Sequence, residues 1–298
     1  MDKLDFSRPD RFYKGNMHTH STHSDGSLSA EAVCDAYRGE GYDFLVMTDH
    51  FMEVYGFPVT DTRPYRTDDF TTIIGAELHA PETAVGEIWH IKSIGLPFDF
   101  EPLREGETGP EIAKRAHEAG AFIGLVHPSW YGLTHDDARQ LPFAHAVEIY
   151  NHGSAVEVDR GHDWPFLDTL LNEGWKLSGY ATDDAHELTH DWRGGWVMVQ
   201  AEENEPELLL DALKAGRYYS SMGPEIHDIA IDGDHVTVRC SPASVISLQG
   251  RGSRSKRAMG DNLETATFEL YPFEKSWFRV TINDANGNRA WSNPYWLD

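Results

Sequence analysis

The segment HTHSTHSDG, residues 18–26, says more about the fold than any other part of this 298-residue chain. Side chains on an extended strand repeat every two residues, so His18 and His20 are expected to point to the same face. Two neutral imidazoles that converge on one point, with the carboxylate of Asp25 close behind them, form a metal-ligand arrangement. The segment therefore predicts a metal site.

Composition limits the class of protein. A hydrophobic content of 40% and an aromatic content of 12% are typical of a globular chain with a sizeable core, in one large domain or in a domain of about 200 residues with a smaller one. The formal net charge of −24 argues against binding to nucleic acid or to an anionic membrane. Only Cys34 and Cys240 are present, and the sequence has no apolar leader or membrane span, so we expect a cytoplasmic protein without disulfides.

Short apolar runs alternate with helical patterns, which predicts an α/β architecture with largely parallel strands. Strands are expected at 44–47, 73–77, 88–94, 122–126, 146–150 and 175–180. Helices are expected from Ser29 to about Glu40, from Pro110 to Gly120 and from Pro206 to Gly216. Serine, proline and glycine at these positions are the usual start and stop signals of helices.

The pattern changes after Gly223-Pro224. From there the chain alternates apolar and polar residues, with turn signals at Asp232-Gly233 and Asn286-Gly287. We therefore expect two domains: an α/β domain over residues 1–223 and a small antiparallel β-sandwich over residues 224–298.

Ionisable side chains lie on or just after the C-terminal ends of the apolar runs. They are His50, Glu77, His90, His127, Asp184 and His186. In a barrel of parallel strands this is the face at which catalytic residues gather, so residues far apart in sequence would meet there. Mixed nitrogen and oxygen ligands suit Mn²⁺, Fe²⁺ or Zn²⁺, and the lack of cysteine ligands argues against a closed structural zinc site.

These motifs resemble those of the PHP (polymerase and histidinol phosphatase) family. In chain order they are HTHSTHSDG, MTDH, GAE, the histidine of IWHIKSIGL, LVHP and TDDAH, and they span about residues 16–220. KGNMHTHSTHSDG, ATDDAH and the C-terminal DANGNRAWSNPYW resemble the CehA/McbA-type branch, whose members carry a C-terminal β-domain. The resemblance implies a distorted (β/α)7 TIM-like barrel that holds two or three divalent metal ions.

The resemblance also implies nine metal ligands in three groups. The first ion would be held by His18, His20, Glu77 and Asp184. The second ion would share Glu77 as a bridge and be completed by His90 and His127. The third would be held by Asp25, His50 and His186, with Asp25 at a position where many members have histidine.

A carboxylate-bridged metal pair lowers the pKa of a bound water and so provides a nucleophilic hydroxide near neutral pH. Three cations could also hold a phosphoryl group in spite of the net charge of −24. We therefore predict hydrolysis of a phosphorylated small molecule, a phosphomonoester, phosphodiester or cyclic phosphate, with Glu77, Asp184 and His186 as catalytic residues. The general acid stays open between Asp184, His186 and the third metal ion.

Two other functions stay open. The same ions could cleave a carboxylic ester, carbamate or amide, which the scarcity of basic residues near the motifs favours. The chain could also be a non-catalytic metal-binding module whose β-domain binds a partner. Candidate substrate contacts are Arg193, Arg217 and Trp130. Lys92 is more typical of a surface charge, and His79 could either face the barrel mouth and contact substrate or be an ordinary histidine without a role in the site.

Overall fold

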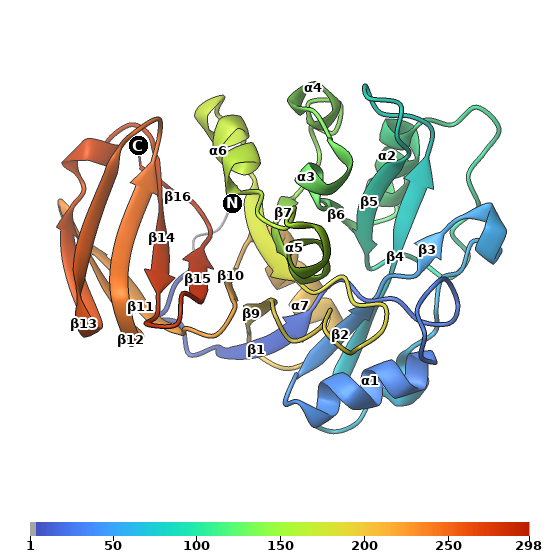
Figure 1. Cartoon of the computed structure of the whole chain (residues 1–298), viewed down its shortest axis with the longest axis horizontal. Coiled ribbons are helices and arrows are strands. Elements are labelled where there is room, and N and C mark those ends of the chain that lie inside the picture. The colour runs from blue at the N-terminus through green and yellow to red at the C-terminus, as the bar shows by residue number, and fades with distance from the viewer. Residues whose placement is uncertain (1–3, 298) are drawn as a thin grey trace.

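The computed structural model describes residues 4–297 and shows a mixed α/β protein with one large sheet (Figure 1). Its first ten strands are β1 (Arg11–Asn16), β2 (Phe44–Met47), β3 (His50–Phe51), β4 (Thr71–Ala80), β5 (Trp89–Ile94), β6 (Phe122–Leu125), β7 (Ala146–Asn151), β8 (Ser178–Thr182), β9 (Trp196–Ala201) and β10 (Tyr218–Ser221). The later strands are β11 (Ile226–Asp232), β12 (His235–Gly250), β13 (Ser255–Glu269), β14 (Trp277–Asn283), β15 (Arg289–Ser292) and β16 (Tyr295–Trp296). The helices are α1 (Ala30–Gly39), α2 (Gly109–Glu118), α3 (Pro128–Tyr131), α4 (His135–Ala138), α5 (His152–Val158), α6 (Trp164–Asn172) and α7 (Pro206–Ala215), with 3-10 turns η1 (Glu53–Tyr55), η2 (Arg63–Tyr65) and η3 (Tyr271–Phe273).

The three predicted helices are confirmed as α1, α2 and α7. The hydroxyl of Ser29 accepts a hydrogen bond from the N–H of Ala32, which caps α1 as its sequence predicts. Thr108 and Glu111 form a capping box at the start of α2. Gly216 ends α7 with a φ of 75°, a left-handed conformation that glycine adopts without strain.

The strands β1, β2 and β4 run parallel, as do β6, β7 and β8, but β5 is antiparallel to both of its neighbours, β4 and β6. The expectation that His90 follows the C-terminal end of its run is therefore wrong, because His90 is the second residue of β5. His90 still reaches the same edge as Glu77, since an antiparallel strand begins where its parallel neighbours end. We call this edge, at which β2, β4, β6, β7 and β8 end and β5 begins, the mouth.

The sheet is not closed. Its pairing runs from β11 through β10, β9, β1 and β5 to β8, and within residues 4–297 no strand pairs β8 back to β9 or β10. Side chains cover the edge of β8 instead: Ser220 Oγ accepts from the N–H of Ala181 at 3.0 Å, and Asn293 Oδ1 accepts from the N–H of Gly179 at 2.8 Å. The architecture is therefore α/β as predicted, whereas a closed (β/α)7 barrel is not confirmed.

The chain after residue 223 forms antiparallel strands, as the alternating pattern predicts. Ile246 and Leu248 of β12 and Val280 and Ile282 of β14 are fully buried in one apolar cluster. These strands are red and orange in Figure 1, and they continue the main sheet because β15 pairs with β10. A separate β-sandwich is therefore not confirmed.

Apolar side chains fill the space enclosed by the sheet below the mouth. Val46, Ile94, Phe122 and Tyr180 belong to this buried cluster together with residues of α7. Other clusters contain the buried side chains of α2 and α6 and, separately, of α1. No helix within residues 4–297 combines the length and apolarity that a membrane span requires.

Candidate metal centre

The His18-Thr19-His20 segment lies between two strand ends at the mouth. The N–H of His20 donates to the carbonyl of Ala185 at 2.9 Å, and the N–H of Asp184 donates to the carbonyl of His18 at 2.9 Å. On its other side the segment bonds to Thr48, which follows β2. These bonds hold the segment extended, and both histidine side chains are fully buried.

The turn after His20 is fixed by Asp49. Its carboxylate accepts from the N–H of Ser21 at 2.7 Å and from the hydroxyl of Thr60 at 2.5 Å. The turn also requires glycine at position 26, because a Cβ there would lie 2.6 Å from the carbonyl carbon of His20. Asp49 and Gly26 therefore hold the turn after His20 in place but are not themselves candidate metal ligands.

The two oxygens of Glu77 face different histidines. Oε2 lies 3.0 Å from His50 Nδ1 and 3.4 Å from His18 Nε2. Oε1 lies 2.9 Å from His90 Nδ1 and 3.4 Å from His127 Nε2. The carboxylate is fully buried and could therefore bridge two metal ions, one on each oxygen.

Asp184 completes the first group. Its Oδ1 lies 2.9 Å from His18 Nε2 and 3.0 Å from His20 Nε2, and its Oδ2 lies 3.9 Å from His127 Nε2. Asp184 and His127 are non-glycine residues with positive φ, of 59° and 26°. Such conformations are costly and cluster at functional sites, where neighbouring structure holds them.

The third group lies at the solvent-facing rim. His50 Nε2 lies 3.3 Å from Asp25 Oδ2, and His186 Nε2 lies 3.5 Å from Asp25 Oδ1. His20 also belongs here, because its Nδ1 lies 3.9 Å from the same Asp25 oxygen. The side chains of Asp25 and His186 are 41% and 33% exposed, so this group is open while the other two are buried.

All nine predicted ligands fall into groups whose ligand atoms lie within 4.8 Å of one another. Donors bound to one ion at about 2.0–2.2 Å are separated by about 3.0–3.5 Å, which is close to the nitrogen–oxygen distances found here. The residues present therefore fit divalent metal ions.

The charges of the cluster are balanced by protons on histidine. Burial opposes a charge on His18, but Asp184, Glu148 and Glu77 outweigh burial and hold the pKa of His18 well above its usual value. In the same way burial lowers the pKa of His50, while Glu77 and Asp25 raise it to about 10. Divalent ions would replace these protons as the counter-charge, because metal ligands must be deprotonated.

Glu148 and Asn151 of β7 support the cluster and were missed in the sequence. Glu148 Oε1 lies 2.9 Å from His18 Nδ1, and its Oε2 accepts from the N–H of His127 at 2.7 Å. Asn151 Nδ2 donates to Glu148 at 2.9 Å and to Asp184 at 3.0 Å. A carboxylate behind a ligating histidine fixes the orientation of the ring. The signal was a charged residue inside the apolar run 146–150.

Lys92 and His79 differ from their sequence interpretation. Lys92 is not a surface charge: it is fully buried and donates to Thr48 Oγ1 at 3.1 Å. His79, left open in the sequence, lies inside the cluster, with Nε2 2.8 Å from His50 Nδ1 and 3.9 Å from Glu77 Oε2. The sequence signal for the burial of Lys92 was its position within the apolar run 88–94.

The three candidate substrate contacts lie in different places. The ring of Trp130 is 5.1 Å from that of His127 and is 43% exposed, so it stands at the mouth. Arg193 forms an ion pair with Glu40 at 2.9 Å. Arg217 lies between α7 and β10.

Fold and cluster together define an α/β protein whose site could hold several divalent ions. The chain matches no family model. It superposes with a TM-score of 0.56 and 15% identity on a two-domain protein from Bacteroides vulgatus ATCC 8482 that contains a predicted PHP-like metal-dependent phosphoesterase, over 100% of this chain and 99% of that one. The PHP resemblance of the motifs is thereby confirmed at the level of the fold.

Two curated relatives match in sequence. They are Xaa-Pro dipeptidases of Stenotrophomonas maltophilia strains K279a and R551-3, with 21% identity over 169 residues and 23% over 171 residues. Each match takes in 53% of this chain, and the chain spans 38% of the length of each relative.

Proposed function

We propose that the protein is a metal-dependent hydrolase that cleaves phosphoesters of small molecules. The observation that carries the proposal is the carboxylate of Glu77, whose Oε2 faces His18 of the first buried group and whose Oε1 faces His90 of the second. Divalent ions bound there would lower the pKa of a coordinated water and polarise the bond under attack.

The residues of the chain have distinct roles in this proposal. Glu77 and Asp184 hold the two buried groups at a fixed separation, and Glu148 keeps His18 in the orientation that a ligand needs. At the open rim His186 is placed to meet the leaving group, together with the ion that it would share with Asp25 and His50.

Trp130 forms one side of the mouth in the proposal. Its ring lies beside His90 and His127, with centroid distances of 5.6 and 5.1 Å. An exposed aromatic face next to the second metal group offers apolar contact to a bound substrate.

Hydrolysis of an uncharged ester or an amide is the second candidate. Neither Arg193 nor Lys92 is placed to bind a phosphate tail, because Arg193 is paired with Glu40 and Lys92 is buried beneath the ligands. This favours an uncharged substrate. The sequence relatives are named as dipeptidases, which cleave an amide bond. The same ions would serve either reaction, since both need an activated water and a polarised oxygen.

Metal analysis of the purified protein, followed by a substrate screen, tests the proposal. We expect two or three bound ions of zinc, manganese or iron, and metal-dependent release of product from phosphomonoesters or phosphodiesters. Release only from carboxylic esters or amides would select the second candidate. A protein without bound metal and without metal-dependent turnover would contradict both.

The variant His20→Ala separates an enzyme from a non-catalytic metal-binding module. We expect it to abolish turnover, whereas His227→Ala, which removes an exposed histidine of β11, should leave turnover unchanged. Circular dichroism must show that both variants fold. Turnover that persists in His20→Ala would show that the cluster does not take part in the reaction.

Three finer points belong to the same proposal. The division into residues 1–223 and 224–298 is supported by the apolar cluster in which most buried side chains of β11, β12 and β14 lie, and by the two-domain neighbour that covers the whole chain. The CehA/McbA-type branch rests on the motifs alone. A cytoplasmic location rests on the sequence composition.

A further inference from the structure

An apolar hollow of about 360 Å³ lies beside the metal-ligand cluster. Its walls come from β3 and the region of η1, from the end of β4, from the loop between β4 and β5, and from the loop that precedes α2. The apolar side chains that line it are Phe51, Met52, Phe57, Ala80, Ile88 and Leu103. Hollows of this size and lining are typical of sites for small apolar groups.

His79 connects the hollow to the cluster. It lines the hollow, and its Nε2 lies 2.8 Å from His50 Nδ1. The side chain is only 4% exposed, and its Nδ1 has no hydrogen-bond partner within the described part of the chain. A molecule whose reacting bond lies at the cluster would therefore have the hollow as its immediate neighbour.

The charged groups of the hollow do not favour an anion. Glu53 and Glu105 contribute carboxylates to the rim, and Arg104 is the one arginine among the lining residues. Arg104 already donates to Glu101 at 2.7 Å. With a net charge of −24 on the whole chain, the hollow favours an uncharged apolar group over a phosphate or carboxylate tail.

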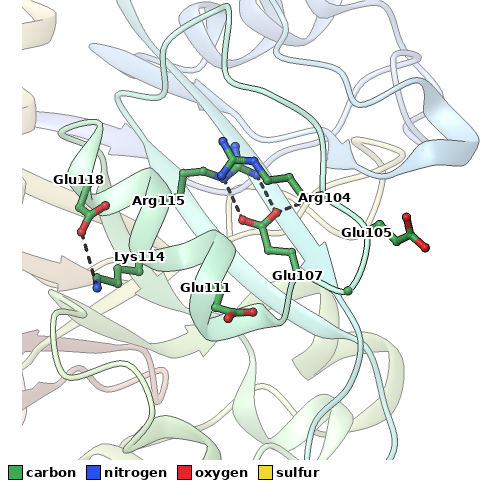
Figure 2. A pocket seen from close by; sticks show the side chains of 8 residues that line it. Arg104, Glu105, Glu107, Glu111, Lys114, Arg115 and Glu118 are labelled. Carbon is green, nitrogen blue, oxygen red and sulfur yellow. Dashed lines mark hydrogen bonds and ion pairs between the residues drawn. The ribbon is translucent and has the colours of Figure 1, made fainter.

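The outer wall of the hollow is held in place by Arg115 of α2. Its guanidinium donates to both oxygens of Glu107, at 2.9 and 2.8 Å, and to the carbonyl of Glu101 at 2.8 Å. Figure 2 shows this pair in a charged hollow, which has a volume of about 420 Å³ and shares Arg104, Glu105 and Gly106 with the apolar one. Paired charge-assisted bonds fix geometry, so Arg115 holds both ends of the segment 103–106 that lines the apolar hollow.

We propose that this hollow is the specificity pocket of the enzyme: it binds an uncharged, apolar substituent of the substrate while the bond to be cleaved lies at the cluster. The proposal rests on the proposed function and narrows it to hydrophobic esters, of phosphoric or carboxylic acid. Sugar phosphates and nucleotides are excluded as preferred substrates, because their substituents are polar.

Two matched series of substrates test the pocket: methyl to butyl phosphate and methyl to butyl acetate. Each buried methylene contributes about a fourfold increase, so three methylenes should raise kcat/KM by about 60-fold. The slope with chain length is expected in whichever series the enzyme cleaves. A flat series would overturn the proposal.

Two variants of the loop between β4 and β5 provide the control. Ile88→Glu places a carboxylate in the pocket, and we expect the butyl-to-methyl ratio to fall at least about tenfold. Val85→Glu introduces the same charge on the same loop but outside the pocket, at a side chain that is 54% exposed, and should leave the ratio within about twofold. Equal ratios in the two variants would overturn the proposal.

Binding of 1-hexanol, followed by saturation-transfer NMR, tests the pocket without any turnover. The wild type and Val85→Glu should bind 1-hexanol, and Ile88→Glu should not. Binding with this pattern in a protein without metal-dependent turnover of any phosphoester, carboxylic ester or amide would contradict the proposed function and leave the pocket supported. Turnover without a chain-length effect and without hexanol binding would contradict the pocket and leave the proposed function supported.

Discussion

Replacement of Lys92 by methionine removes a buried positive charge from beneath the cluster. Burial lowers the pKa of Lys92 to about 8, against the raising effect of Glu77, Glu148 and Asp184. The ammonium is therefore charged at pH 7 and interacts electrostatically with these three carboxylates. Methionine fills a similar volume without charge, so the substitution tests the charge and changes packing little.

The loss should be large in the metal-free protein. Removal of one partner from a buried ion pair costs about 3–5 kcal/mol, because the remaining charge is left uncompensated. Lys92 donates to Thr48 rather than directly to a carboxylate, and burial disfavours its charge, so we expect a loss at the lower end of that range. A loss of about 3 kcal/mol in a chain of this size lowers Tm by about 6–12 °C. Bound divalent ions restore positive charge to the carboxylates, so the metal-loaded variant should lose less. Its metal affinity should rise about tenfold, or about 1.4 kcal/mol, because the ammonium no longer repels the ions.

Thermal unfolding by circular dichroism, with and without metal, gives the change in Tm, and chelator competition gives the metal affinity. The matched control is Ile94→Met, on the same strand two residues further along and equally buried. It creates the same side chain without removing a charge. A Lys92→Met protein that is more stable without metal, or that binds metal more weakly than the wild type, would refute the reasoning.

Three further predictions concern the cluster and its supports. Glu148→Gln weakens the bond to His18 Nδ1, so metal affinity should fall about 10–100-fold in the same chelator assay, with an unchanged fold. Gly26→Ala forces a Cβ against the backbone of His20, so activity and Tm should both fall, and an unchanged crystal structure with full activity would contradict this. His50 has a pKa of about 10, above the value of 6.5 expected unfolded, so its charge stabilises the metal-free protein below pH 6.5 and this stabilisation is lost as the pH rises to 10. Tm measured across that range should therefore fall without metal and stay flatter with metal.

The sequence predicted the local elements well where the signals were local. Ser29 as a cap, Pro206 at the first helical position and Gly216 after the last turn marked helices that the structure contains. The same holds for the placement of His18 and His20, which follows from the two-residue period of an extended segment. These features depend on neighbours in sequence, and a single chain displays them.

The sequence did not predict features that depend on partners far along the chain. Lysine is rarely buried unless it is paired, and the carboxylates around Lys92 come from β4, from β7 and from the segment after β8. The direction of β5 was missed because strand pairing, not periodicity, decides whether a run is parallel or antiparallel. The eight residues that join β4 to β5 are too few for a parallel crossover, and that was the available signal.

The HTHSTHSDG segment by itself determined that His18 and His20 share one face, because side chains of an extended segment repeat every two residues. Only the tertiary structure decided which atoms meet. It brought one oxygen of Glu77 to His50 and the other to His90. It also set Glu148 behind His18 and joined the C-terminal strands to the main sheet. Those contacts depend on strand order and on long-range packing, which local side-chain periodicity does not encode.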